Sequence, residues 1–244
     1  MSPVAVVLAA GKGTRMGSDL PKVLHPLLGQ PLVVHPIRAA RAAGVAAIIL
    51  VVGHGAAAVR STLSPAFPDL RYALQAEQRG TGHAILCALP ELAAHDGPVL
   101  ILSGDVPGLR SATLRALVDR CAASPAGLAL ATFVPDDPRG YGRIVRDAAG
   151  RVEAIVEERD ADAATRAIRE CNAGVYCAAA AVLRRELPRI GTANAQGEIY
   201  LTDLVAAVAA DGVEALPVAA DEVAGVNTPE QLAAIADRMA ASAG

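Results

Sequence analysis

The sequence is poor in aromatic residues. Phenylalanine, tyrosine and tryptophan make up 2% of the 244 residues, and tryptophan is absent. Because 53% of the chain is hydrophobic, the sequence still predicts an ample core, built from alanine, valine, leucine and isoleucine. Clusters of aromatic side chains therefore do not help to locate a binding site.

The chain also has no concentration of charge of one sign. It carries 22 basic and 25 acidic residues, with a formal net charge of -3, and its lysines and arginines do not cluster. A non-specific nucleic-acid binder needs a basic stripe that displaces counterions from phosphates. We therefore expect no nucleic-acid partner, and any anionic ligand has to be held by a local site.

Paired cysteines and long apolar runs are missing as well. Cys87, Cys121, Cys171 and Cys177 show no C-x-x-C spacing and no histidine at zinc spacing, which argues against a disulfide framework and a zinc site. The apolar run at residues 3–10 is too short to span a bilayer and lacks a preceding basic segment. We expect free thiols, no membrane partner and a cytoplasmic location.

The two commonest nucleotide-binding loops are absent from the glycine-rich segment at residues 8–17. The spacing from Gly11 and Gly13 to Gly17 is one residue too long for the dinucleotide fingerprint, and the second predicted strand ends at Gly53 rather than at an acid. No Gly-Lys-Ser/Thr follows a four-residue spacer, so there is no Walker A motif. This excludes a typical dehydrogenase and a P-loop enzyme.

What the sequence does contain is an alternation of short apolar runs with helical periodicity. The predicted strands cover residues 4–8, 47–52, 71–74, 99–102 and 128–134. The predicted helices cover residues 31–43, 56–63, 82–94 and 111–121. This pattern is typical of a Rossmann-like, doubly wound α/β sheet.

The alternation changes after residue 135. Residues 141–145 and 152–156 flank a D-A-A-G turn, which predicts an antiparallel hairpin. We predict one domain over residues 1–244. Its core comprises residues 1–135, a ligand-facing lobe covers about 139–195, and residues 196–244 return to the core with closing helices at 201–210 and 229–241.

Two cations, Arg15 and Lys22, accompany the glycines that follow the first strand. Glycines let the backbone approach a ligand, and open α/β sheets bind ligands at the carboxyl ends of their strands. Arginine can hold a phosphate through two hydrogen bonds, while lysine acts as a point charge. Taken alone, the loop is equally compatible with two solvated cations.

Asp105 follows the strand at residues 99–102, within S-G-D-V-P. Mg²⁺ takes one or two protein carboxylates together with phosphate and water oxygens, so a single aspartate at this sheet edge can anchor it. The alternative is an aspartate that only initiates the turn before Pro107.

A series of motifs follows in order between residues 8 and 228. They are L-A-A-G-K-G-T-R-M, P-K-V-L-H, V-G-H-G, Q-A-E-Q-R-G-T-G-H-A, S-G-D-V-P, G-Y-G-R-I, I-V-E-E, N-A-G-V-Y, N-A-Q-G-E-I-Y-L-T-D and G-V-N-T. With them the chain resembles the uridylyltransferase domain of the bacterial bifunctional N-acetylglucosamine 1-phosphate uridylyltransferase/glucosamine-1-phosphate acetyltransferases. The resemblance implies a glycosyltransferase-A-like mixed sheet with an inserted antiparallel sugar-binding lobe.

The resemblance also implies two sets of nucleotide contacts. Main-chain atoms would bind the nucleoside and phosphates at Leu8, Ala9, Ala10, Gly11 and Gly13, with Lys22 beside them. The uracil edge would be read by Gln75, Gln78, Gly80 and Thr81. A glutamine amide both donates and accepts, which suits the uracil imide. Without the resemblance, the two glutamines read as an exposed polar turn.

For the metal, the resemblance implies that Asn227 joins Asp105 as a second oxygen ligand. The alternative is that Asn227, or Thr228, caps the helix that begins at Pro229.

For the sugar, the resemblance implies contacts with Gly140, Glu157 and Asn172. Glu157 could equally be a solvated carboxylate after a strand. Three further residues match the family without an assigned role: Tyr200, Thr202 and Asp203.

The implied reaction joins UTP to N-acetylglucosamine 1-phosphate with Mg²⁺ as cofactor, and it yields UDP-N-acetylglucosamine and pyrophosphate. Arg15 and Lys22 would be the catalytic cations. A sugar phosphate is already a nucleophile near neutral pH, so the five histidines are predicted to be structural.

Two alternatives remain, a nucleotidyltransferase for another sugar 1-phosphate or a molybdopterin-type acceptor, and a non-catalytic nucleotide-sugar-binding module. The hexapeptide repeat of the family's acetyltransferase β-helix is absent from this sequence, so acetyltransferase activity is not implied.

Overall fold

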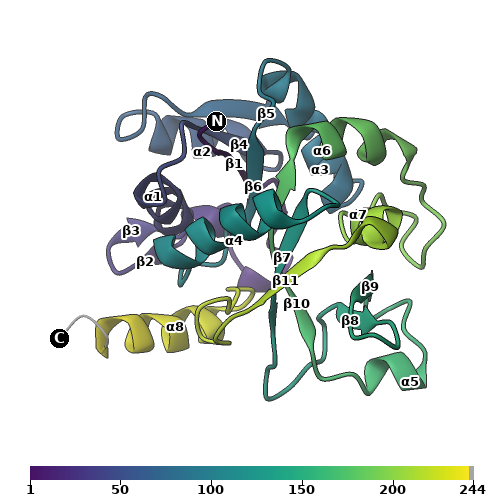
Figure 1. Cartoon of the computed structure of the whole chain (residues 1–244). Coiled ribbons are helices and arrows are strands. Elements are labelled where there is room, and N and C mark those ends of the chain that lie inside the picture. Colours follow the sequence, from purple (N-terminus) through teal and green to yellow (C-terminus); the bar gives the residue numbers. More distant parts are fainter. Residues whose placement is uncertain (242–244) are drawn as a thin grey trace.

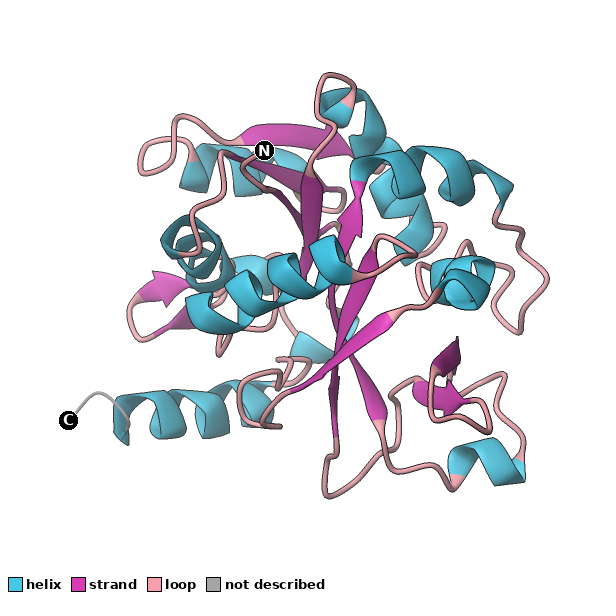
Figure 2. Ribbon diagram, viewed as in Figure 1, coloured by secondary structure: helices cyan, strands magenta, loops and turns pink. Residues whose placement is uncertain are grey.

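A mixed sheet with helices on both faces forms the centre of the computed structural model, which describes residues 1–241 (Figures 1 and 2). The main path of the sheet has the order β11-β7-β10-β6-β1-β4-β5. These strands are β1 (Val4–Ala9), β4 (Ala47–Val52), β5 (Arg71–Leu74), β6 (Pro98–Ser103), β7 (Leu128–Phe133), β10 (Cys171–Ala179) and β11 (Glu214–Pro217).

The direction of the strands brings their ends together at one edge. β1 is parallel to both of its neighbours, with Ala5 opposite Ile48 of β4 and Leu100 of β6. β5 is parallel to β4, and β11 is parallel to β7. β10 is antiparallel to both β6 and β7. The parallel strands therefore share one carboxyl edge, where open α/β sheets bind their ligands.

The period-2 pattern of the strands divides the core between the two faces of the sheet. Ala5 and Val7 of β1 belong to one hydrophobic cluster, and Val4 and Val6 belong to the other. The first face is covered by α1 (Val34–Ala42), α2 (Ala56–Leu63) and α4 (Ser111–Ala123). The second face is covered by α3 (Thr81–Ala88), α6 (Ala180–Glu186) and α7 (Asp203–Val208). None of the helices within residues 1–241 has the length and hydropathy needed to cross a bilayer.

The last helix, α8 (Pro229–Ala241), packs on the segment that follows β1. Ile235 belongs to a third cluster with Met16, Leu27 and Leu32. Short elements shape that segment, with 3₁₀ turns at Thr14–Met16 and Lys22–Leu24 and a small ribbon of β2 (Pro26–Leu27) and β3 (Gln30–Pro31). The packing ties the end of the chain to the loop after the first strand.

A hairpin of β8 (Arg143–Arg146) and β9 (Val152–Val156), with the short helix α5 (Ala163–Arg166), projects from the sheet. β8 meets the main sheet where Arg143 is opposite Cys171 of β10. In Figure 1, this hairpin and α5 lie at the lower right, across from α8 at the lower left.

The doubly wound mixed sheet predicted from the sequence is confirmed, and so is the hairpin turn at residues 147–150. Three predicted helices are too long. The helix expected at residues 201–210 covers only Asp203–Val208, and a 3₁₀ turn at Ala209–Asp211 follows it. The helix expected at residues 31–43 begins at Val34, because residues 30–31 pair as β3. The helix expected at residues 82–94 gives way at Leu89 to a 3₁₀ turn, since Pro90 supplies no N–H for an α-helical bond.

The expected lobe at about 139–195 divides into two parts. Its hairpin and α5 stand apart from the core, whereas β10 runs through the middle of the main sheet, between β6 and β7. This strand and the edge strand β11 were not predicted. β10 consists mostly of small apolar residues, and its pairing depends on contacts with strands far away in the sequence.

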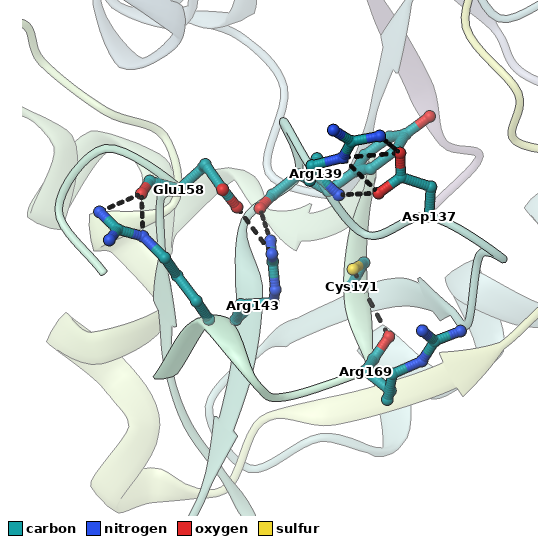
Figure 3. Close-up of polar contacts among 8 residues, drawn as sticks. Asp137, Arg139, Arg143, Glu158, Arg169 and Cys171 are labelled. Atoms are coloured by element: carbon teal, nitrogen blue, oxygen red, sulfur yellow. Dashed lines mark hydrogen bonds and ion pairs between the residues drawn. The ribbon is translucent and has the colours of Figure 1, made fainter. Parts of the chain in front are cut away.

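A nearly buried ion pair fastens the hairpin to the segment that follows it (Figure 3). Arg143 of β8 places Nη2 2.7 Å from Oε2 of Glu158, with 2% of the arginine side chain and 29% of the glutamate side chain exposed. Nη1 of Arg143 also donates to the carbonyl of Tyr141. The guanidinium thus has its compensating charge within a low-dielectric setting.

We expect Glu158→Gln to lower the free energy of unfolding by about 3 kcal/mol, because it leaves the Arg143 guanidinium buried without a counter-charge. Denaturant unfolding measures this change. Glu153→Gln, an exposed carboxylate on β9, serves as the control and should stay within about 0.5 kcal/mol of the wild type. Equal free energies of unfolding for the two variants would contradict the claim that Glu158 stabilises the buried Arg143 guanidinium.

Candidate active site

The candidate site lies at the carboxyl edge of the sheet, where the chain leaves β1 and β6. The Gly104 N–H donates to the Leu8 carbonyl over 2.9 Å. A Cβ on Gly104 would lie 2.8 Å from that oxygen, so only glycine allows the two segments to approach this closely. The glycine-rich loop and Asp105 therefore leave the sheet side by side.

Four predicted side chains meet at this edge. Nζ of Lys22 donates to Oδ2 of Asp105 and, over 3.2 Å, to Oδ1 of Asn227. Nη2 of Arg15 donates to the same Asn227 oxygen over 3.0 Å. The Lys22 and Asp105 side chains are 15% and 20% exposed, so water only partly screens their attraction. We call these four residues the charge cluster.

Backbone contacts explain how Asn227 reaches the charge cluster. The Val226 N–H donates to the Asp105 carbonyl over 2.9 Å, which holds the chain before α8 against the turn after β6. Thr228 caps α8, because its Oγ1 accepts from the Gln231 N–H over 3.3 Å. The capping role considered for Asn227 thus falls to Thr228, and the Asn227 amide is available to the cluster.

Gly13 makes room for Lys22. Its φ is 62°, and a Cβ there would lie 2.5 Å from the Lys22 Cβ. Gly13 therefore packs directly against the lysine side chain, and a larger residue here would displace it. Gly13 does not line either of the hollows described below.

A hollow of about 290 Å³ lies on one side of the charge cluster. Every residue predicted to bind the nucleotide lines it except Gly13, namely Leu8, Ala9, Ala10, Gly11, Lys22, Gln75, Gln78, Gly80 and Thr81. We call it the nucleotide-side hollow. Much of this lining comes from the loop after β1 and the turn between β5 and α3.

A tight backbone contact holds the turn before α3. Gly80 has a φ of 103°, and a Cβ on it would lie 2.4 Å from the Ile199 carbonyl. The Gly82 N–H donates to that carbonyl over 2.8 Å, and Oγ1 of Thr81 accepts from the Leu201 N–H over 3.1 Å. Residues 198–201 therefore pack against residues 80–82 and hold this turn in place.

A second hollow, of about 490 Å³, lies on the other side of the charge cluster. It is lined by the three predicted sugar-binding residues and by three members of the cluster: Gly140, Glu157, Asn172, Arg15, Asp105 and Asn227. We call it the sugar-side hollow. The two hollows share Ser103 and Asp105 in their linings, so they adjoin at the charge cluster.

Neighbouring groups fix the two predicted sugar-binding side chains, those of Asn172 and Glu157. Nδ2 of Asn172 donates to the Tyr176 hydroxyl over 2.6 Å, and its Oδ1 accepts from the Gly174 N–H over 3.0 Å. The Thr202 hydroxyl donates to Oε1 of Glu157 over 3.1 Å. Thr202, which had no role at the level of sequence, thus orients Glu157.

Burial raises the pKa of Glu157 above its ordinary value, and the hydrogen bond from Thr202 opposes this shift. Asp160 and Asp203 add smaller repulsions that also raise the pKa. Burial thus makes the charged form of Glu157 costlier, and a ligand that donates hydrogen bonds to this carboxylate would offset that cost.

The raised pKa predicts a pH-dependent cost in stability. Between the unfolded and the folded pKa of Glu157 the native state binds more protons, so the free energy of unfolding falls as pH rises through that window. We expect Glu157→Gln to remove this loss, so that the variant gains stability relative to wild type as pH rises from about 4 to 8.

Thermal unfolding across that pH range measures the difference. The exposed Glu91→Gln is the control, and its difference from wild type should stay flat. A flat profile for Glu157→Gln would contradict the burial argument.

Several lining residues escaped the sequence analysis. Glu198 and Ser103 line the nucleotide-side hollow, and both lie next to or within motifs that were noted. Asp137 and Arg139 line the sugar-side hollow, where the Arg139 Nη2 donates to Asp137 over 2.6 Å (Figure 3). Their only signal was the P-D-D-P-R-G segment before the hairpin.

The charge cluster fits a divalent cation of the magnesium type. The Lys22 ammonium already bonds to one carboxylate oxygen and one amide oxygen, so Asp105 and Asn227 present hard donors to a common cation. Within residues 1–241, no group of three or more His, Cys, Asp or Glu side chains is arranged to hold a metal. Mg²⁺ needs only one or two protein ligands when phosphates and water supply the rest.

Residues 5–173 match the family of MobA-like NTP transferase domains. The chain belongs to this family. The match covers β6 and nearly all of β1, ends within β10, and includes every predicted site residue before Ala173. Most of the charge cluster and of the lining of both hollows therefore lies within the matched residues, whereas Asn227 and Glu198 lie beyond them.

Curated relatives extend the similarity to most of the chain. The bifunctional protein GlmU of Anaeromyxobacter dehalogenans strain 2CP-C is 52% identical over 232 residues, which cover 94% of this chain and 48% of the relative. The GlmU proteins of Chromohalobacter salexigens and Cellvibrio japonicus are 52% and 50% identical, each over 94% of this chain and 50% of the relative. The chain therefore spans about half the length of these relatives, and the resemblance inferred from the motifs is confirmed.

Proposed function

We propose that this NTP transferase domain transfers the uridylyl group of UTP to N-acetylglucosamine 1-phosphate, with Mg²⁺ as cofactor, and releases pyrophosphate. The observation that carries this proposal is the charge cluster at the junction of the two hollows. Because both substrates are cytoplasmic metabolites, the proposal places the reaction in the cytoplasm.

The two hollows divide the substrates between them. The nucleotide-side hollow takes UTP, with its base toward Gln75 and its phosphates toward the glycine-rich loop. The sugar-side hollow binds the N-acetylglucosamine ring, and Glu157 and Asn172 form hydrogen bonds with the polar groups of the sugar. The acceptor phosphate then approaches the α-phosphorus at Asp105, where the hollows adjoin. Such placement supplies much of the catalysis in phosphoryl-type transfers.

The charges of the cluster have distinct tasks. Asp105 and Asn227 would hold Mg²⁺, which when bound compensates the negative charge of the triphosphate. The Lys22 ammonium would then bind phosphate oxygens of the triphosphate. Arg15, which donates to the same Asn227 oxygen as Lys22, stabilises the departing pyrophosphate through its guanidinium hydrogen bonds.

The family and the relatives support this choice of reaction. The ordered motifs resemble the uridylyltransferase domain of the bifunctional enzymes, and the GlmU proteins match 94% of this chain. The proposal is confined to the uridylyl transfer.

A pyrophosphate-release assay tests the proposal. The assay tests every combination of four nucleoside triphosphates with the 1-phosphates of glucose, galactose, mannose and N-acetylglucosamine. Each combination is measured with Mg²⁺ and again after a chelator has removed it. We expect the highest kcat/KM for UTP with N-acetylglucosamine 1-phosphate, and no release after chelation. A higher kcat/KM for another pair would contradict the substrate assignment. The absence of release from every pair would indicate a binding module.

Lys22→Ala should lower kcat by about a hundredfold, because a preorganised charge that stabilises the transition state is lost. Steady-state kinetics measure the change. The chain's other lysine provides the matched control, since Lys12 is exposed on the same loop, and Lys12→Ala should lower kcat less than tenfold. An unchanged kcat in Lys22→Ala would refute the role of this lysine.

Asp105→Asn should raise the magnesium concentration needed for half-maximal activity by at least tenfold, because a neutral amide replaces the charged metal ligand. Magnesium titration of the rate measures this, and circular dichroism confirms the fold. Asp119→Asn makes the same change at an exposed site on α4 and should titrate like wild type. If Asp105→Asn needs the same magnesium concentration as wild type for half-maximal activity, Asp105 does not bind the metal.

A further inference from the structure

We propose that His83, behind the nucleotide-side hollow, sets the preference for uracil over cytosine by fixing the orientation of the Gln75 amide. This inference rests on the proposed function, in which UTP occupies that hollow. His83 acts as a positioning residue, because it touches Gln75 and is absent from the residues that line the hollow.

Gln75 is held firmly where β5 ends. Its N–H donates to the Val52 carbonyl over 2.8 Å, which continues the pairing of β5 with β4. The residue is 4% exposed and lines the nucleotide-side hollow. A buried amide in this position has to satisfy its hydrogen bonds with fixed partners or with the ligand.

Two protein groups face Nε2 of this amide. Nε2 donates to the Gly80 carbonyl over 3.0 Å and lies 3.2 Å from Nδ1 of His83. A carbonyl only accepts, so the group that faces it has to be the NH₂ end of the glutamine. The second N–H of that group then needs an acceptor, and unprotonated Nδ1 of His83 provides it.

The other imidazole nitrogen agrees with this assignment. Nε2 of His83 lies 3.7 Å from the Cys87 sulfur, one helical turn further along α3. Cys87 is only a weak hydrogen-bond partner, so the tautomer is governed by the shorter contact with Gln75. In this tautomer the proton is on Nε2, and Nδ1 is an acceptor.

The consequence is that Gln75 presents an acceptor to the base. In the described part of the chain, the hydrogen bonds of this side chain engage only Nε2, which leaves Oε1 for the ligand. Uracil carries an N–H at position 3, which can donate to Oε1. Cytosine carries a lone pair at that position, which would face the lone pairs of Oε1.

Reversal of the amide would let it read cytosine, but it would turn Oε1 toward the Gly80 carbonyl and the His83 lone pair. Two acceptors therefore oppose the reversed orientation. Without His83, only the Gly80 carbonyl opposes it, and one N–H of the amide has no partner. The discrimination between the two bases should weaken accordingly.

Calorimetric titration of UTP and CTP into the magnesium-loaded protein tests the proposal, alongside kcat and KM for UTP. His83→Leu removes the acceptor, so the ratio of the CTP to the UTP dissociation constants should fall about tenfold. The kcat at saturating UTP should stay within about twofold of wild type. His83→Asn keeps an acceptor oxygen near the place of Nδ1, so it should largely restore the ratio.

Cys87→Ala is the matched control, because Cys87 lies at the nitrogen that faces away from Gln75, and its base ratio should equal that of wild type. A wild-type ratio in His83→Leu, or an equal loss in His83→Asn, would overturn the proposal. Wild-type protein that binds no uridine nucleotide would instead overturn the proposed function.

A second measurement needs no variant and does not depend on folding of His83→Leu. A long-range ¹H–¹⁵N spectrum of wild-type protein at pH 8 reports the His83 tautomer. The proposal requires the proton on Nε2. A proton on Nδ1 would make that nitrogen a donor toward Gln75 and would contradict the assignment.

Discussion

The contact on which the site depends is the one between the Lys22 ammonium and the oxygens of Asp105 and Asn227. It joins three chain segments that are separated by up to 205 residues. The carboxylate is only partly solvated, so a cation at this point is strongly favoured. In the free protein Lys22 provides that cation. Under the proposed function, Asp105 and Asn227 would hold a metal ion at this place, and Lys22 would bind phosphate oxygens.

The rest of the fold holds these segments in place. β1 and β6 are adjacent parallel strands, so the glycine-rich loop and Asp105 leave the sheet together. α8 packs on the loop after β1 through the cluster around Ile235, and Thr228 caps it, which leaves the Asn227 side chain to the site. On the other side, residues 198–201 back the turn at Gly80, and Thr202 orients Glu157. The nucleotide-side hollow is thus backed by the core, whereas the sugar-side hollow lies between the core and the segments that flank the hairpin.

Local patterns predicted the elements that depend on local chemistry. The strand at Ala47–Val52 and the helices at Ala56–Leu63 and Pro229–Ala241 agree with the sequence to the residue, because their periodicity and end signals are strong. β10 could not be predicted, since its place in the sheet is decided by distant strands. For the site, the motifs indicated most lining residues, but the role of Gly13 behind Lys22 and the contact of His83 with Gln75 follow only from packing.

The central claim is that Asp105 and Asn227 share one metal ion in the presence of UTP, and the three asparagines of the chain allow a direct test. In protein labelled with ¹⁵N-asparagine, Mn²⁺ with UTP should broaden the Asn227 side-chain amide beyond detection. It should broaden that of Asn194, which lines neither hollow, much less. The same titration with Asp105→Asn should leave Asn227 visible at equal metal concentration. An Asn227 signal that stays as sharp as that of Asn194 in wild-type protein saturated with Mn²⁺ and UTP would contradict the account.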